Sequence, residues 1–325
     1  MTQTHFSAAE RTASDYYDSA DADCFYEEVW GGEDIHIGLY ASETEAIAPA
    51  SQRTVNALIA LIGTFPRGAT VVDLGSGYGG AARRLAKEFG AHVEAINISS
   101  VENARHRQLN LSAGLQDHIQ VHDASFEDVP LPSGCADVVW SQDAILHSGN
   151  RQQVLQEAAR LLKPGGVMVL TDPMAADGVE TDSLSAILDR IHLPDMGSPD
   201  RYRAWASQAG LVREVWQDQT AMLIRHYSRV REELLRREQE LKTKISPEYL
   251  QRMAAGLGHW IDGGRQGRLS WGLMRFRKPP AGGLMESFAG AVVIFVVGGV
   301  VTLATTVMVI QGHLHWRGRD PWGEG

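Results

Sequence analysis

Short apolar runs alternate with amphipathic stretches through the middle of the chain. The apolar runs predict buried strands at 70–74, 92–98, 119–123, 136–141 and 166–172. The stretches between them carry apolar residues at helical spacing, which predicts helices at 80–89, 101–113 and 151–162. Strands that alternate with helices in this way predict a doubly wound, mostly parallel α/β sheet.

The pattern differs on both sides of this region. Residues 1–64 hold aromatic clusters and one apolar-periodic helix at 54–62, which a Pro-Arg-Gly break at 66–68 ends. Residues 175–263 predict an insertion with helices around 182–191, 199–209, 219–243 and 247–262, interrupted by a strand at 211–216, and a last strand follows at 269–276. We therefore predict an N-terminal aromatic and helical segment over 1–64, and a sheet domain over 65–278 whose helical insertion forms a lid.

The C-terminal part is apolar in a different way. Residues 288–310 are 23 positions without a charge, dense in Val, Ile, Leu, Ala and Gly. At 1.5 Å per residue they would form a helix of roughly 35 Å, long enough for a hydrocarbon core of ~30 Å. This predicts a linker at 279–286, a transmembrane helix at 287–311 and a tail at 312–325. A buried helix or a C-terminal extension is the alternative.

Composition narrows the classes of partner. The formal net charge of −10 argues against duplex nucleic acid, whose phosphates require clustered Lys and Arg. Cys24 and Cys135 are too few for a disulfide framework, and neither stands in a zinc-binding pattern. No apolar signal-peptide region opens the chain. We expect a cytosolic domain that acts on a small molecule, with the C-terminal helix as its membrane anchor.

A glycine-rich loop leaves the first predicted strand and enters a helix. Gly75, Gly77 and Gly80 satisfy G-x-G-x-x-G, so a dinucleotide site is one alternative. However, Asp73 stands where dinucleotide-binding folds usually place a small apolar residue. The second strand ends in Asn97, whereas an NAD site has an Asp or Glu there to hold the ribose. These two departures favour another nucleotide ligand.

Later motifs identify that ligand. Asp123-Ala124-Ser125 follows strand three, Asp137-Val138-Val139-Trp140 forms strand four, and a Lys-Pro-Gly-Gly turn precedes strand five. This order is typical of class I S-adenosylmethionine-dependent methyltransferases, which have a Rossmann-like, seven-stranded sheet. Gly75 and Gly77 would then pass under the methionine part of the cofactor, and Asn97 would bind the ribose. Asp123 and the N–H of Ala124 would hold the adenine. For Asp123, a strand-end turn residue is the alternative.

Segments outside this core are more specific. They include Val29–Tyr40, Ser141–Ser148, Thr171–Met174, Ile187–Ile191, Asp195–Ser198, His226–Ser228 and His259–Gly272. Together, over about residues 15–278, they resemble sarcosine/dimethylglycine N-methyltransferases. The resemblance implies methylation of sarcosine and dimethylglycine on nitrogen to give glycine betaine, an osmoprotectant. The apolar C-terminal segment lies outside it.

That chemistry indicates which residues could bind the acceptor. Methyl transfer from a sulfonium is an in-line displacement that needs no metal ion, and a carboxylate acceptor calls for an Arg. Candidates within the family-like segments are Arg190, Arg203 and Arg265. Aromatic faces hold methylated ammonium groups; the candidates are Tyr16, Tyr17, Trp30, Tyr40, Tyr227 and Trp271.

Two residues after strand four are catalytic candidates. His147, with Asp143 four residues earlier, could orient the acceptor amine or receive its proton, although His147 could instead cap the following helix. Tyr17 and Gln142 are further candidates for cofactor contacts. Two other hypotheses remain at this point: a related methyltransferase for another amine, a thioether or a prenylated ring, and a non-catalytic, membrane-tethered binding protein.

Overall fold

The structure is a computed structural model that describes residues 11–12, 14–15, 18–30 and 32–281. The chain divides into two compact units, Met1–Pro279 and Pro280–Gly325. Within the described residues, no helix is both long and apolar enough to cross a bilayer. The transmembrane helix predicted at 287–311, the cofactor contact predicted for Tyr17 and the acceptor contact predicted for Tyr16 lie outside the described residues.

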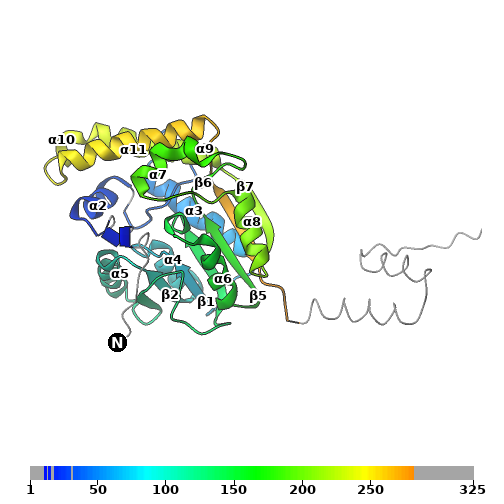
Figure 1. The fold of residues 1–325 in the computed structure, drawn as a ribbon. Helices are drawn as coiled ribbons and strands as arrows, with labels where there is room; N and C mark the ends of the chain where they lie inside the picture. The colour runs from blue at the N-terminus through cyan, green and yellow to red at the C-terminus, as the bar shows by residue number, and fades with distance from the viewer. Residues whose placement is uncertain (1–10, 13, 16–17, 31, 282–325) are drawn as a thin grey trace, which may run out of the picture. The chain divides into compact units, whose positions relative to one another are not determined.

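A seven-stranded sheet forms the centre of the first unit, in the order β3-β2-β1-β4-β5-β9-β7 (Figure 1). Neighbouring strands are parallel except at β9, which is antiparallel to both β5 and β7. The strands are β1 (Thr70–Leu74), β2 (His92–Asn97), β3 (Ile119–Asp123), β4 (Ala136–Gln142), β5 (Leu162–Thr171), β7 (Val212–Asp218) and β9 (Gly272–Arg277). The predicted doubly wound, mostly parallel sheet is confirmed.

Helices cover both faces of this sheet, because side chains along each strand alternate between its two faces. Val71 and its neighbours on one face pack against α3 (Ile47–Ile62) and α4 (Gly80–Phe89). Val72 and its neighbours on the other face pack against α6 (Arg151–Leu161) and α8 (Pro199–Gln208). Helix α5 (Ser100–Ser112) follows β2 and contacts β3.

Four predicted elements differ from the structure. Strand β5 begins at Leu162, so the turn predicted at 163–166 is part of the strand, and the helix predicted at 219–243 is divided into Thr220–Arg236 and Glu238–Leu241. Helix α3 begins at Ile47 rather than at 54, since Pro49 lies in the first turn, where its missing N–H is tolerated. The predicted strand at 269–276 is interrupted at Trp271. Its first part, β8 (Leu269–Ser270), pairs with β6 (Met174–Ala175) in a separate two-stranded sheet.

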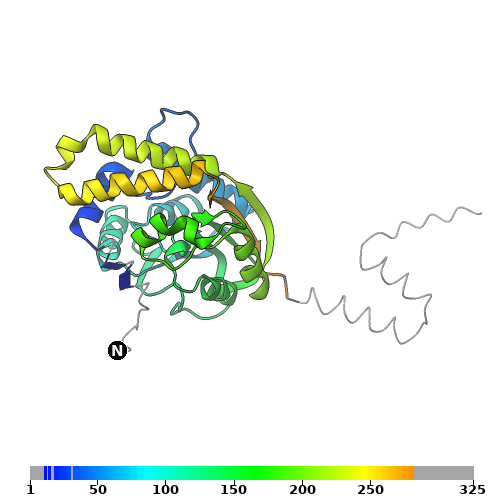
Figure 2. The same ribbon diagram turned by 45° about the horizontal axis from the view of Figure 1, so that its top comes forward.

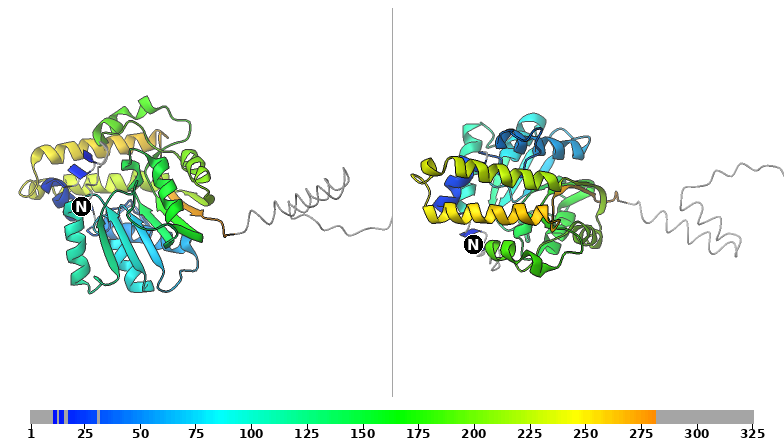
Figure 3. Two further views of the ribbon diagram at one scale, coloured as in Figure 1. Left: turned by 60° about the horizontal axis from the view of Figure 1, so that its bottom comes forward. Right: turned by 90° about the horizontal axis from the view of Figure 1, so that it is seen from above.

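Figure 2 shows a layer of helices at one end of the sheet. A third apolar core lies among these helices. Helices α9 (Thr220–Arg236) and α11 (Pro247–Arg265) lie side by side across this layer, connected through α10 (Glu238–Leu241) (Figure 3). Helix α2 (Ala20–Phe25), the π-helix η1 (Tyr26–Trp30) and α7 (Ser185–Ile191) share this core, as does Leu184 of η3 (Thr181–Leu184), which precedes α7. The N-terminal segment and the lid therefore belong to one packed body.

Candidate active site

Two adjoining cavities open where the parallel strands end. The first, which we call the glycine-loop cavity, measures about 680 Å³ and is lined by Ile35, His36, Gly75, Gly77, Asn97, Ile98, Ser99, Glu102, Phe126, Gln142, Asp143, Ala144 and His147. The second, the aromatic cavity, measures about 830 Å³ and includes Tyr26, Trp30, Asp143, His147, Arg190, Tyr227 and Trp260 in its lining. Ile35, Asp143 and His147 line both cavities and mark their junction.

The loop after β1 forms one wall of the glycine-loop cavity through its backbone. Gly75 has φ +79°, a conformation that favours glycine, and a Cβ there would lie 2.3 Å from the Cβ of Ala144. Gly77 has φ +50°. The loop therefore lines the cavity with backbone, and its contact with the cofactor stays a prediction.

Asn97, at the end of β2, lines the same cavity and is hydrogen-bonded to a second polar residue that also lines it. Its Nδ2 donates to Oε2 of Glu102 at 2.9 Å, on the first turn of α5. Glu102 is 4% exposed, and burial raises the pKa of its carboxyl to about 7, against the effect of the Asn97 hydrogen bond. A buried carboxyl thus lines this cavity although the strand itself ends in an amide.

Sequence reasoning missed Glu102, although the signal was present. Ser99 and Glu102 form the Ser-x-x-Glu spacing of a helix-capping box. Ser99 does cap α5, since its Oγ accepts the N–H of Glu102 at 3.1 Å. The Glu102 side chain, however, is hydrogen-bonded to Asn97 and lines the cavity, although the capping-box spacing assigns it to the start of the helix.

Gln142 supplies an unpartnered polar group in the glycine-loop cavity. Its Oε1 accepts from Nε1 of Trp140 at 3.1 Å, whereas its buried Nε2 has no hydrogen-bond partner among the described residues. An unsatisfied buried donor costs free energy, which a ligand acceptor would recover. This donor, with the glycine backbone and the Asn97–Glu102 pair, fits a nucleotide-like ligand that has hydroxyls and polar edges.

The predicted adenine contacts lie outside the residues that line this cavity. The side chain of Asp123 is 55% exposed and accepts from Asn103 at 2.9 Å and from Arg107. Burial alone would raise the pKa of this carboxyl, but Arg107 and Asn103 hold it below its usual range. The N–H of Ala124 donates to the carbonyl oxygen of Asn97 at 3.2 Å, so the structure places that donor in the sheet. The adenine contacts stay a prediction.

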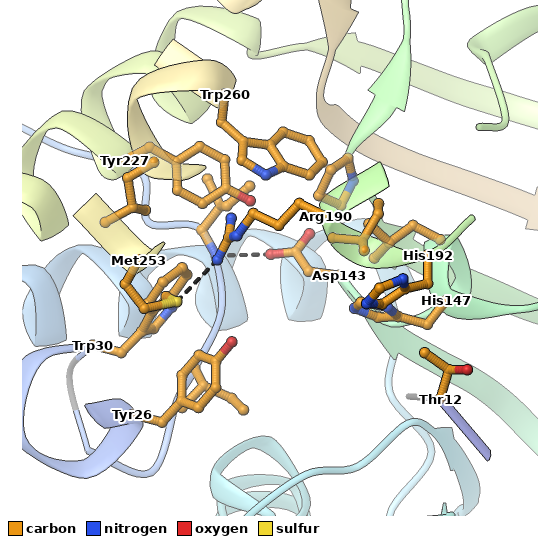
Figure 4. A pocket seen from close by; sticks show the side chains of 16 residues that line it. Thr12, Tyr26, Trp30, Asp143, His147, Arg190, His192, Tyr227, Met253 and Trp260 are labelled. Carbon is orange, nitrogen blue, oxygen red and sulfur yellow. Dashed lines mark hydrogen bonds between the residues drawn. The ribbon is translucent and has the colours of Figure 1, made fainter. Parts of the chain in front are cut away.

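Four aromatic rings surround the aromatic cavity, and they come from three helices of the lid core (Figure 4). Tyr26 and Trp30 lie on η1, 5.2 Å apart between ring centroids. Tyr227 on α9 lies 5.9 Å from Trp30 and 5.4 Å from Trp260 on α11. Trp30 and Tyr227 were predicted to contact the acceptor, whereas Tyr26 and Trp260 were missed, because only the packing of η1 and α11 against α9 brings them together.

Arg190 reaches into this ring of aromatic side chains from α7 (Figure 4). Its Nη2 donates to Sδ of Met253 at 2.9 Å. Its guanidinium lies against the bare backbone of Gly256, where a Cβ would be 2.3 Å from Cζ. Within the described part of the chain no carboxylate forms an ion pair with Arg190, so its charge is available to a ligand anion.

Asp143 lies at the junction of the two cavities, just after β4. Its Oδ1 accepts from Nε1 of Trp271 at 2.8 Å, and its Oδ2 accepts from the N–H of Ile37 at 2.7 Å. Burial raises the pKa of the carboxyl to about 6, while these two donors act in the opposite direction by stabilising the charged form. Asp143 is therefore largely ionised at pH 7.

His147 lies at the same junction, at the end of the 3-10 helix η2 (Ile145–His147). Burial, followed by the nearby charge of Arg151, lowers the pKa of its imidazole to about 4. The ring is thus neutral at pH 7 and has one nitrogen able to accept a hydrogen bond. The structure brings it beside Asp143, as the sequence spacing suggested.

Four residues predicted to contact the acceptor line neither cavity. The hydroxyl of Tyr40 pairs with Nδ1 of His226 at 2.9 Å in the lid core, and Trp271 is fully buried behind Asp143. Arg203 is exposed and pairs with Asp200 at 3.0 Å. Arg265 is exposed at a surface groove that it shares with Glu232 and Asp262. Trp271 still acts on the site through its hydrogen bond to Asp143.

Known proteins resemble this chain over most of its length. Residues 72–170 match a family model described as a methyltransferase domain. The chain is 64% identical to a dimethylglycine N-methyltransferase of Parasynechococcus marenigrum (strain WH8102), over 86% of this chain and 100% of that protein. It is 49% identical to a sarcosine/dimethylglycine N-methyltransferase of Halorhodospira halochloris, with the same coverage of both chains.

A solved structure gives the same result. The crystal structure of a Galdieria sulphuraria protein assigned as a sarcosine dimethylglycine methyltransferase shares 48% identity and a TM-score of 0.77, covering 81% of this chain and 99% of that one. The resemblance found in the sequence is confirmed, and the dinucleotide alternative is set aside. The chain belongs to the sarcosine/dimethylglycine N-methyltransferase family of S-adenosylmethionine-dependent enzymes.

Proposed function

We propose that this protein methylates sarcosine and dimethylglycine on nitrogen to give glycine betaine, with S-adenosylmethionine as the methyl donor. The observation that carries this proposal is the junction of the two cavities at Asp143, His147 and Ile35. Donor and acceptor on opposite sides of this junction would be held in line, and such alignment contributes roughly 7–11 kcal/mol to lowering the barrier.

The glycine-loop cavity fits the methyl donor. S-adenosylmethionine supplies an electrophilic methyl group on a sulfonium. Gly75 and Gly77 admit a ligand close to the backbone, and Gln142 Nε2 offers it an unpartnered donor. Asn97 and Glu102 are placed to bind hydroxyl groups of a ribose.

The aromatic cavity fits a methylated amino acid. The guanidinium of Arg190 would bind the acceptor carboxylate as a two-pronged donor. The rings of Tyr26, Trp30, Tyr227 and Trp260 would surround the methylated ammonium group, whose positive charge is attracted to aromatic faces. Arg203 and Arg265, which the structure places on the surface, have no part in this proposal.

Asp143 and His147 would act on the acceptor nitrogen. Positive charge builds on this nitrogen as the methyl group arrives, and the ionised carboxylate of Asp143 would stabilise it. An alkylammonium has a pKa near 10, whereas His147 has a pKa of about 4, a gap that corresponds to roughly 8 kcal/mol. His147 would therefore orient the amine and pass its proton on to water rather than retain it.

An acceptor panel tests this function. Purified protein with methyl-labelled S-adenosylmethionine should turn over sarcosine or dimethylglycine, and Arg190→Ala should raise the acceptor KM about 10–100-fold. Arg203→Ala, which removes an exposed Arg, is the matched control and should change little. If glycine, sarcosine and dimethylglycine all remain unmethylated, the proposal fails and another small acceptor, such as a thioether or a prenylated ring, must be sought. Failure to bind S-adenosylmethionine in calorimetry would favour a non-catalytic binding protein.

We also propose that residues 287–311 anchor the enzyme in a membrane, with the catalytic domain in the cytosol. The uncharged stretch at 288–310 supports this. Membrane fractionation of the full-length chain and of a chain lacking residues 284–325 tests it. Full-length protein should sediment with membranes and the shortened chain should not. Full-length protein that stays in solution without detergent would overturn the anchor.

A further inference from the structure

The turn that carries His147 is held at its centre by hydrogen bonds to two buried ionisable residues, Asp172 and Arg151. The N–H of Leu146 donates to Oδ1 of Asp172 at 3.1 Å. The carbonyl oxygen of the same residue accepts from Nη2 of Arg151 at 2.9 Å. Asp172 is 1% exposed and Arg151 is 4% exposed, so water competes little for either bond. The position of the peptide next to His147 is therefore fixed from outside the cavities.

Asp172 also accepts a hydrogen bond from helix α8. It follows β5, and its Oδ2 accepts the hydroxyl of Tyr202 on α8, which is fully buried. Burial raises the pKa of Asp172 to about 8, and the charge of Asp143 acts in the same direction. Asp172 lines neither cavity. Asp172 therefore affects the site through the groups that donate hydrogen bonds to it, and these bonds matter more than a negative charge.

Arg151 connects the other side of the turn to the segment before α8. Its Nη1 donates to Oδ1 of Asp195 at 2.8 Å, and its Nη2 donates to the carbonyl oxygen of Asp195 at 2.8 Å. Asp172 thus connects the turn at 144–148 to α8, and Arg151 connects the turn to the segment that precedes α8. Such a network has few alternative arrangements, because each unmade bond would leave a buried polar group unsatisfied.

We propose that Asp172 is a positioning residue for methyl transfer, which sets the place of His147 at the cavity junction through the N–H of Leu146. This rests on the function proposed above. Displacing a catalytic group by about 1 Å can cost roughly 10²-fold in rate. Asp172→Ala should therefore lower kcat about 10–100-fold while the KM values for both substrates change little. Asp172→Asn should retain most of the activity, since its amide oxygen can accept from Leu146 and its amide N–H can donate to Tyr202.

A double-mutant cycle separates positioning from loss of stability. Leu211→Ala, in the same apolar core as Tyr202, is the stability control and should lower Tm while kcat below that temperature stays unchanged. In the His147→Gln background, Asp172→Ala should add little further loss, because both substitutions remove the same contribution. A kcat for Asp172→Ala that equals the wild-type value, or losses that multiply in the double variant, would overturn the proposal.

A second measurement is independent of turnover. The imidazole NMR signals of His147, assigned with His147→Gln, should move in Asp172→Ala and stay near their wild-type positions in Asp172→Asn. If the wild-type protein methylates none of the acceptors, the proposed function fails, but these signals still report whether Asp172 positions His147. Signals that are unchanged in Asp172→Ala would refute the positioning role by themselves.

Discussion

Asp143 has an unfavourable backbone conformation, and both oxygens of its carboxylate accept hydrogen bonds. Its φ of +51° is uncommon for a residue other than glycine. The hydrogen bonds from Trp271 and Ile37 offset this cost and fix both carboxylate oxygens. Strain of this kind persists where the surroundings over-determine a residue, which is frequent at functional sites.

The charge of Asp143 gives a pH prediction. Activity should fall as pH drops through about 6, since the ionised carboxylate is the active form and is lost by protonation below its pKa. Asp143→Asn should lower kcat about 10²–10³-fold and remove this part of the pH profile. Trp271→Phe removes one donor to the charged form, so it should raise the pKa of Asp143 and move the acidic limb to higher pH. An acidic limb that is unchanged in Trp271→Phe would argue against Asp143 as its origin.

Glu102 gives a prediction about donor binding. At pH 8, above the pKa of the Glu102 carboxyl, Glu102→Leu should raise the Kd for S-adenosylmethionine about 10–100-fold, the cost of losing hydrogen bonds to a charged acceptor. Isothermal calorimetry measures the Kd, and the acceptor KM should change little. Gln108→Leu changes an exposed residue of the same helix and serves as the control. Equal Kd values for the two variants would remove Glu102 from the cofactor site.

At the scale of elements, helix α11 is shaped by glycines that differ in their surroundings. A Cβ at Gly256 would meet the guanidinium of Arg190, whereas a Cβ at Gly258 would meet nothing within 4 Å. Gly256 therefore leaves room for the Arg190 side chain to cross the helix. At Gly258, no neighbouring side chain within the part of the chain that the structure describes requires a glycine.

This difference gives a matched pair of variants. Gly256→Ala should displace the guanidinium of Arg190 and raise the acceptor KM several-fold, with the Kd for S-adenosylmethionine unchanged. Gly258→Ala should leave both constants unchanged and stabilise the protein by roughly 0.5–1 kcal/mol, since Ala is the better helix former. Steady-state kinetics and thermal unfolding measure these effects. Identical kinetics for the two variants would mean that Arg190 does not need the space at Gly256.

For the whole molecule, the N-terminal segment and the lid share one core. Phe25 is fully buried and lies 6.4 Å from Trp30 and 5.9 Å from Tyr249 between ring centroids. Ion pairs add to this packing, since Glu28 binds both Arg237 and Lys244. Residues close to the N-terminus therefore help to build the wall of the aromatic cavity.

Shared packing predicts shared stability. Phe25→Ala should lower the free energy of unfolding by about 3–5 kcal/mol, the usual cost of a large cavity in a core. The protein should still unfold in a single transition in differential scanning calorimetry. Leu235→Ala changes a side chain that is 46% exposed and should cost less than about 0.5 kcal/mol. A separate low-temperature transition for Phe25→Ala would show that the N-terminal segment folds on its own.

Local patterns were sufficient for the sheet and the glycine loop. Alternating apolar runs and helical periodicity predicted the parallel strands, because each pattern reflects burial within a single element. The same holds for Gly75 and Gly77, whose spacing reflects a turn between adjacent elements. Asn97 and Gln142 could also be assigned to the cavity, since the ends of parallel strands meet at one edge of the sheet.

By itself, the sequence determined the fold class, the family, the glycine loop and the junction residues Asp143 and His147. Only the tertiary structure decided which side chains complete the site. Arg190, Arg203 and Arg265 looked equivalent along the chain, and the packing of α7 against α11 brings only Arg190 into a cavity. The reason is physical: a turn is specified by its neighbouring residues, whereas a pocket wall is specified by long-range packing between helices, which no local pattern records.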